Sequence, residues 1–160
     1  MQETAKELGK ILLSAGSLLT LIEEEDASLK PAPDKWSKKE ILGHLIDSAC
    51  NNQQKFVRAM AEKHVDFVGY QQRRWVESQK YNARFWQELF VFWTLYNTHL
   101  IHLIENVAPE VLANEITIDG AGPFTLEFIM KDYVEHLKHH LKQILPDADL
   151  DSNFENIYNT

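Results

Sequence analysis

Residues 124–145 read FTLEFIMKDYVEHLKHHLKQIL, the strongest helical signal in the chain. Three histidines lie within five residues of this stretch, and two of them, His136 and His140, are four positions apart. On an α-helix they project from the same face, one turn apart. The neighbouring face is apolar, because its side chains recur at spacings of three and four. That apolar row consists of Met130, Val134, Leu137, Leu141 and Leu145.

Three further stretches have helical periodicity, so the sequence predicts an all-α four-helix bundle with crossover connections. The sequence Ser37-Lys38-Lys39-Glu40 is a capping box that starts the second helix, and Trp36 before it is placed to pack on Ile41. Pro146 closes the last helix. We expect one domain over residues 1–146 and an acidic tail, 147–160, docked loosely if at all. The expected helices are 3–25, 38–62, 82–106 and 125–145, and Asn82 and Thr125 are the expected N-caps of the last two.

The connections between these helices are less regular. Val65–Ser78 is aromatic and polar without a clear period, so we expect a long connection with a short helix at its end. Ile116–Ile118 is a candidate extended segment. In the third helix the expected apolar stripe leaves Trp86 and Trp93 exposed, which favours a homodimer formed through a helix face. That stripe is Phe85, Leu89, Phe92, Tyr96, Leu100, Leu103 and Val107.

Composition excludes several classes of function. The chain has 24 acidic against 16 basic side chains, a formal charge of −8, which argues against nucleic-acid binding. Its single cysteine, Cys50, fits a reducing cytoplasm and is expected to be a buried, inert thiol. The apolar run 11–22 is too short to span a membrane and has acidic rather than basic flanks. We therefore expect a cytoplasmic protein that acts on a small molecule, without nucleic-acid or membrane partners.

The histidine pair on the last helix can direct two ring nitrogens at one metal ion, and a third ligand must then come from another helix. His44, at the margin of the second helix's apolar stripe, is the candidate. Three protein ligands leave a position for water or substrate, as in catalytic sites. The alternatives are a solvated pair and a packed His44 hydrogen-bonded to a carbonyl.

The other polar side chains near these histidines have secondary roles. Asp47 and Glu135 are candidates to orient the imidazoles from behind, as is Asp132. His99 could supply a fourth ligand, although packed or solvated positions suit both it and His102. His139 points about 100° away from His140, and His64 lies at the expected end of the second helix, where it would interact with the dipole.

Two of these stretches resemble the signature of the DinB/YfiT-like superfamily. One runs from Trp36 to Ser48 and continues at Phe56-Val57-Arg58-Ala59, and the other is Tyr133-x-x-His136-x-x-x-His140-Leu141. The aromatic segment with Tyr70 and Trp75 is similar to a loop of the YfiT branch, which often carries acidic residues where this chain has Gln71 and Gln72. The resemblance covers most of the chain, from Trp36 to Leu145.

The resemblance implies a four-helix bundle that binds a divalent metal, zinc or nickel, through His44, His136 and His140. It further implies a transferase that activates a low-molecular-weight thiol such as bacillithiol, mycothiol or glutathione on this metal. Family members are also similar to metal-dependent hydrolases, and many form dimers. A non-catalytic bundle that binds a metal or ligand is the third alternative.

Overall fold

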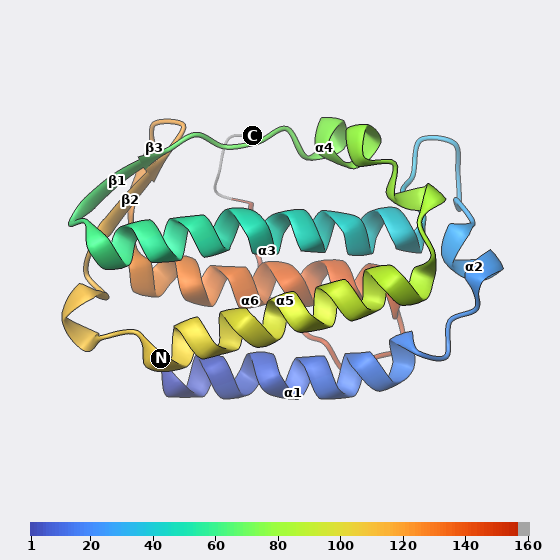
Figure 1. Cartoon of the computed structure of the whole chain (residues 1–160), viewed down its shortest axis with the longest axis horizontal. Coiled ribbons are helices and arrows are strands. Elements are labelled where there is room, and N and C mark those ends of the chain that lie inside the picture. The colour runs from blue at the N-terminus through green and yellow to red at the C-terminus, as the bar shows by residue number, and fades with distance from the viewer. Residues whose placement is uncertain (157–160) are drawn as a thin grey trace.

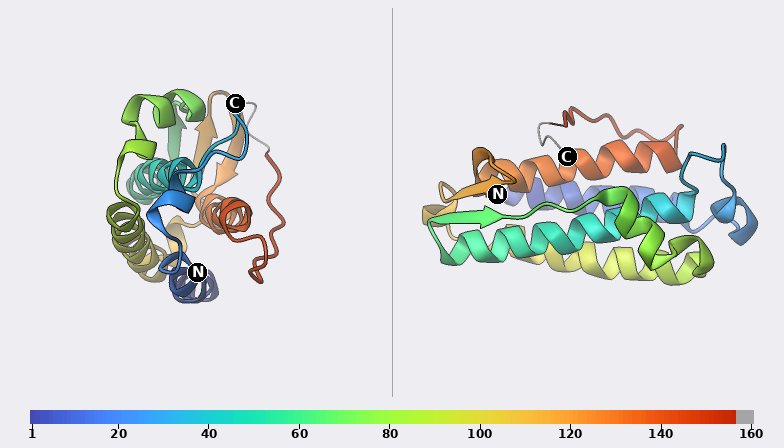
Figure 2. Two further views of the ribbon diagram at one scale, coloured as in Figure 1. Left: turned by 90° about the vertical axis from the view of Figure 1, so that its right-hand side faces the viewer. Right: turned by 90° about the horizontal axis from the view of Figure 1, so that it is seen from above.

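Four long helices pack side by side in the computed structural model, which describes residues 1–156 (Figure 1). Around the bundle, the first helix contacts α5, α5 contacts α3, α3 contacts α6, and α6 contacts the first again. The second and third long helices run in the same direction, which requires a connection along the bundle (Figures 1 and 2). The predicted four-helix bundle with crossovers is therefore confirmed. The long helices are α1 (Gln2–Leu19), α3 (Lys38–Ala61), α5 (Trp86–Asn106) and α6 (Leu126–Ile144).

The core follows the predicted apolar row of α6. Met130, Val134, Leu137 and Leu141 are buried, and Leu145, just after the helix, packs against the core as a half-buried side chain. Thr125 caps α6 as predicted, because its hydroxyl accepts from the Phe128 amide at 3.2 Å. Within residues 1–156 no helix combines the length and hydropathy needed to cross a membrane.

The core face of helix α5 is only partly the expected one: Leu89 and Leu100 of the predicted stripe are fully buried. The helix begins at Trp86, not after Asn82, and its buried side chains include Trp86, Trp93 and Ile104. Phe85 and Phe92 of the predicted stripe are 68% and 47% exposed. The helix is apolar on more than one side, so periodicity alone left two stripes to choose from. The prediction that Trp86 and Trp93 are exposed is thus wrong. The homodimer that it was meant to support stays a prediction.

A small sheet qualifies the all-α prediction. Strands β1 (His64–Phe67), β2 (Glu115–Ile118) and β3 (Ala121–Thr125) form it at one end of the bundle (Figure 1). β1 pairs with β2 in parallel, and β2 with β3 antiparallel. The α3–α5 connection supplies β1 and the α5–α6 connection supplies β2 and β3, and each strand satisfies backbone groups of its neighbour. The expected extended segment at 116–118 is β2, whereas β1 lies in the stretch expected to be irregular.

The connection from α3 to α5 continues past β1 into α4 (Gln72–Gln79) and a 3₁₀ turn, η1 (Tyr81–Ala83). Figure 1 shows α4 lying over α3, and the two helices are in contact. The Tyr81 ring packs so closely on Gly43 that a Cβ there would lie 2.2 Å from it. The Tyr81 hydroxyl donates to Asp47 at 2.7 Å. Gly43 and Asp47 thus fix where the connection re-enters the bundle.

The predicted first helix is interrupted. α1 ends at Leu19, and a separate short helix, α2 (Glu24–Ser28), follows it. The Glu24 carboxylate accepts from the Trp86 amide at 2.8 Å, an otherwise unpaired donor in the first turn of α5, and it also pairs with Lys39. Glu24 is therefore placed where an anion stabilises a helix N-terminus.

The C-terminal tail is more closely docked than expected. Pro146 follows the end of α6, and residues 147–156 run back beside that helix (Figure 2). Leu150 is buried, and the Ser152 hydroxyl donates to the Glu135 carbonyl at 2.8 Å. The Asn153 amide donates to the Glu135 carboxylate at 2.7 Å. The loose tail predicted over 147–160 is thus wrong for 147–156, and 157–160 lie outside the described residues.

Candidate metal centre

The capping box that was read from the sequence sets the start of α3. The Ser37 hydroxyl accepts from the Glu40 amide at 3.2 Å, and the Glu40 carboxylate accepts from the Ser37 amide at 2.8 Å. His44 follows within two turns and is fully buried. The Trp36 ring lies against the His44 ring, with centroids 5.3 Å apart. Trp36, whose expected partner was Ile41, thus supports the His44 ring.

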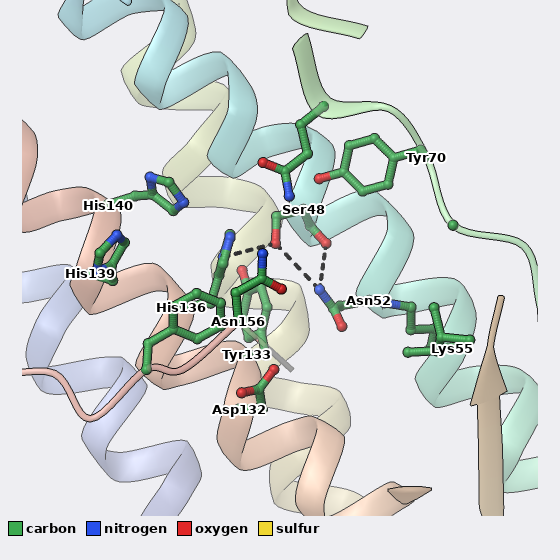
Figure 3. A pocket seen from close by; sticks show the side chains of 14 residues that line it. Ser48, Asn52, Lys55, Tyr70, Asp132, Tyr133, His136, His139, His140 and Asn156 are labelled. Atoms are coloured by element: carbon green, nitrogen blue, oxygen red, sulfur yellow. Dashed lines mark hydrogen bonds between the residues drawn. The ribbon is translucent and has the colours of Figure 1, made fainter. Parts of the chain in front are cut away.

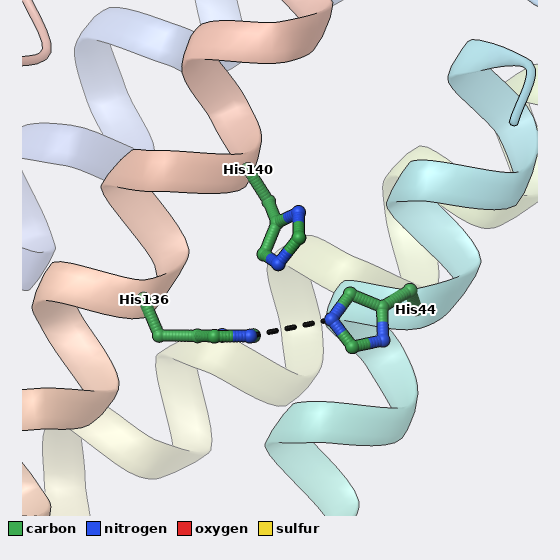
Figure 4. Close-up of side chains that lie close together, drawn as sticks. All are labelled: His44, His136 and His140. Carbon is green, nitrogen blue, oxygen red and sulfur yellow. Dashed lines mark hydrogen bonds between the residues drawn. The ribbon is translucent and has the colours of Figure 1, made fainter. Parts of the chain in front are cut away.

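The structure brings the three predicted histidines together. His44 comes from α3, and His136 and His140 come from successive turns of α6. Figure 4 shows one ring nitrogen of each pointing into the space between the rings. One potential ligand nitrogen from each residue lies within 4.8 Å of the other two, and the Nε2 atoms of His44 and His136 are 3.3 Å apart.

All three imidazoles are held neutral. Burial, together with the nearby His140, lowers the pKa of His44 to about 3. Burial lowers the pKa of His140 to about 4, with His139 adding to the effect. The same desolvation holds the pKa of His136 well below its ordinary value. Neutral imidazole is the form that binds metals, so protons compete weakly for these nitrogens.

The donor set fits a divalent ion. Ser48 Oγ lies 3.3 Å from His136 Nδ1, which leaves His136 Nε2 free to offer its lone pair toward His44. The Nε2 atoms of His44 and His136 can share one proton in a hydrogen bond, and a cation in place of that proton would be bound by the lone pairs of all three rings. Nδ1 of His44 and Nδ1 of His140 are buried and have no hydrogen-bond partner among residues 1–156. Among the three, and within residues 1–156, His136 alone has a hydrogen bond at its Nδ1, the kind of support that is usual behind a ligand histidine.

Two of the three carboxylates predicted to orient the imidazoles, Asp47 and Glu135, form other contacts. Asp47 Oδ1 accepts from Tyr81 and from Gln79 Nε2, at 2.7 and 2.6 Å, and burial raises the pKa of Asp47. Glu135 pairs with Lys138 and with the tail. Neither carboxylate has a hydrogen bond to the three imidazoles within residues 1–156, because the α3–α5 connection and the tail, which periodicity does not reveal, bind these groups instead. Ser48 was missed in this role, although its position one turn after His44 put it on the correct face.

The remaining histidines stand apart from the cluster. His99 and His102 contact Gln53 and Asn106 on the outer side of the bundle, so neither is a fourth ligand. His64 lies in β1 beside Glu115, not at a helix end as predicted. His139 is exposed, with its ring centroid 5.0 Å from that of His140. Cys50 is half-buried on α3, not buried as expected.

A pocket of about 260 Å³ adjoins the cluster, and His136 and His140 form part of its wall (Figure 3). The tail closes one side, where the Phe154 ring centroid is 5.0 Å from that of His136. Burial lowers the pKa of Lys55, in the same wall, to about 8. A small molecule in this pocket would reach the histidine nitrogens. Its polar wall includes Ser48, Asn52, Lys55, Tyr70, Gln72 and Asp132.

Fold and cluster together define a class of protein: helical bundles in which two antiparallel helices supply three histidines beside a pocket. The chain belongs to the DinB superfamily, whose family model matches residues 15–144. It has the fold of YfiT from Bacillus subtilis, with a TM-score of 0.80 over 90% of this chain and 83% of that one, at 16% identity. YfiT is described as a probable metal-dependent hydrolase with an unusual four-helix bundle topology. A comparison with curated proteins found no significant match.

Proposed function

We propose that this protein is a divalent-metal-dependent enzyme for a small molecule, and that His44, His136 and His140 hold the metal. One observation carries the proposal: three neutral imidazoles converge on one point, and two of them line a pocket. Three nitrogen ligands suit zinc or nickel, and they leave room in the coordination shell for a further ligand. Access from the pocket favours a catalytic ion over a purely structural one.

A divalent ion at this point would supply Lewis acidity, which lowers the pKa of a water or thiol that binds beside it. The protein's own groups prepare the site for this chemistry. Ser48 fixes the orientation of His136, and the burial of His44 keeps its nitrogen unprotonated. Phe154 covers the pocket from the side of the tail, which limits the entry of water.

Hydrolysis is the first candidate reaction, supported by the description of YfiT as a probable metal-dependent hydrolase. Transfer of a low-molecular-weight thiol to an electrophile is the second. The resemblance of Trp36–Ser48 and of the Tyr133-x-x-His136-x-x-x-His140 stretch to the YfiT-like branch supports the second candidate.

Elemental analysis of the untagged protein tests the metal site. We expect about one equivalent of zinc or nickel in the wild type and loss of stoichiometric metal in His44→Ala, His136→Ala and His140→Ala. His102→Ala is the matched control, because it removes a histidine outside the cluster. Metal retained in one cluster variant would remove that residue from the site. A wild type that binds no metal even after reconstitution would refute the proposal.

Two assays on the metal-loaded protein separate the candidate reactions. Release of nitrophenol from p-nitrophenyl acetate without thiol, lost in His136→Ala, would support hydrolysis. Conjugation of glutathione to monochlorobimane above the uncatalysed rate, lost in the same variant, would support thiol transfer. Activity of either kind that persists in His136→Ala would not come from this site.

A further inference from the structure

Tyr70 lies between the pocket beside the histidines and a second depression. It lines both, the second having a volume of about 680 Å³ and including Trp36 in its wall. Figure 3 shows the Tyr70 hydroxyl pointing into the first pocket, toward Ser48. Ser48 in turn contacts His136. The phenol therefore faces the candidate metal centre across the space a substrate would occupy.

The position of Tyr70 is fixed by its neighbours. The amide of the preceding residue, Gly69, donates to both carboxylate oxygens of Asp119 at 3.1 Å. The Trp75 ring packs on the Tyr70 ring with centroids 4.7 Å apart. Contacts on the backbone side and on the ring thus hold the hydroxyl in one direction. A group held in this way can act without the cost of ordering a mobile side chain.

The Tyr70 hydroxyl differs from those of the other described tyrosines. Tyr81, Tyr96 and Tyr133 donate to Asp47, Gln53 and Asn97, at 2.7, 2.6 and 2.6 Å. No hydrogen bond joins the Tyr70 hydroxyl to any residue in the described part of the chain. Burial raises the pKa of Tyr70, so the group remains a protonated donor at working pH. A donor that faces a pocket without a protein acceptor is available to a ligand.

We propose that Tyr70 is a catalytic residue that donates a hydrogen bond to a carbonyl or carboxylate oxygen of a substrate placed between it and the three histidines. This inference rests on the proposed function, because the metal would hold the other side of that oxygen-bearing group. When a nucleophile adds to a carbonyl carbon, negative charge develops on the carbonyl oxygen. A fixed donor in a water-poor pocket stabilises that charge.

Ligand binding to the cobalt(II)-loaded protein tests this role without an activity assay. Visible absorption reports both cobalt uptake and the binding of a further ligand. The probes are acetohydroxamate, which offers a carbonyl oxygen, and imidazole, which binds through nitrogen. In Tyr70→Phe we expect the Kd of acetohydroxamate to rise about tenfold, as for one lost hydrogen bond, with the Kd of imidazole and the cobalt stoichiometry unchanged. Tyr96→Phe, which loses a hydroxyl bonded to Gln53 outside this pocket, is the matched control and should bind both probes like the wild type.

The outcomes distinguish the two proposals. Equal affinity of wild type and Tyr70→Phe for acetohydroxamate would refute the role of Tyr70 and leave the metal site standing. Weakened binding of both probes to the same extent would show that Tyr70 acts through packing, which also refutes the inference. A wild type that takes up no cobalt would overturn the proposed function, and the role of Tyr70 with it.

Discussion

Acid should destabilise the metal-free protein through its buried histidine cluster. The folded pKa is about 3 for His44 and about 4 for His140, below the ordinary value of 6.5. The unfolded chain therefore binds more protons over the interval between these values. The contribution of the neutral histidines to the free energy of unfolding is fully present above about pH 6.5 and is lost progressively as the pH falls toward their folded pKa values. His136, whose pKa is also lowered, acts in the same direction.

The size of the effect follows from these shifts. Each pKa unit corresponds to about 1.4 kcal/mol. At pH 5, which is about 1.5 units below the pKa of histidine in the unfolded chain, protonation favours unfolding by about 2 kcal/mol for each histidine that remains neutral in the folded protein. His44 and His140 together then reduce the free energy of unfolding by about 4 kcal/mol between pH 8 and pH 5. Most carboxylates stay ionised over this interval, so acid denaturation through them contributes less.

Urea unfolding of chelator-treated protein at the two pH values measures this loss. The matched comparison is His44→Gln against His102→Gln, since only the first removes a member of the cluster. We expect the pH-dependent loss to be smaller by about 2 kcal/mol in His44→Gln and unchanged in His102→Gln, whatever the absolute stability of either. A His44→Gln protein with the same loss as the wild type would refute the reasoning, because His44 would then not be a neutral buried group.

Three further substitutions test the framework around the site. Gly43→Ala should lower the free energy of unfolding by about 1–3 kcal/mol, because the added methyl group would overlap the Tyr81 ring. Gly9→Ala is the control and should not destabilise α1, because the nearest atom to the added methyl group is 3.9 Å away. Equal effects of the two substitutions in a melting experiment would contradict this prediction. Ser37→Ala should cost about 1 kcal/mol in the same assay through loss of the helix cap, and no change would show that the capping box contributes nothing. Phe154→Ala should speed the release of metal to a chelator, followed by stopped-flow absorption, without removing a ligand; an unchanged rate would mean that the tail does not limit access.

The sequence predicted those parts of the fold that depend on a single helix. The capping box at Ser37 and the cap at Thr125 are local hydrogen-bond patterns, so they could be read directly. The spacing of His136 and His140 needs only the pitch of one helix. Their meeting with His44 could be proposed because each lies at the margin of an apolar stripe, and such margins meet where two helices pack.

The features that were missed depend on contacts between distant segments. Helix α5 is apolar on several sides, and only the positions of α1 and α3 decide that Trp93 is buried while Phe92 is half exposed. Strand β1 has no regular partner nearby in sequence, since it pairs with β2 about fifty residues later. Asp47 is close to His44 in sequence, yet its carboxylate is taken by Tyr81, whose position is set by the crossover.

The contrast between the long helices and the segments that connect or follow them also bears on how the site can change its ligand specificity. The three histidines come from long packed helices, where substitutions that shift the backbone are costly. Part of the pocket wall beside them comes instead from the α3–α5 connection, as Tyr70 does, and from the tail, as Phe154 does. Such segments tolerate change far better than helices in the core. Exchange of residues 69–72 or of the tail should therefore alter ligand preference while metal stoichiometry is retained, and loss of the metal in such a variant would show that these segments also hold the helices in place.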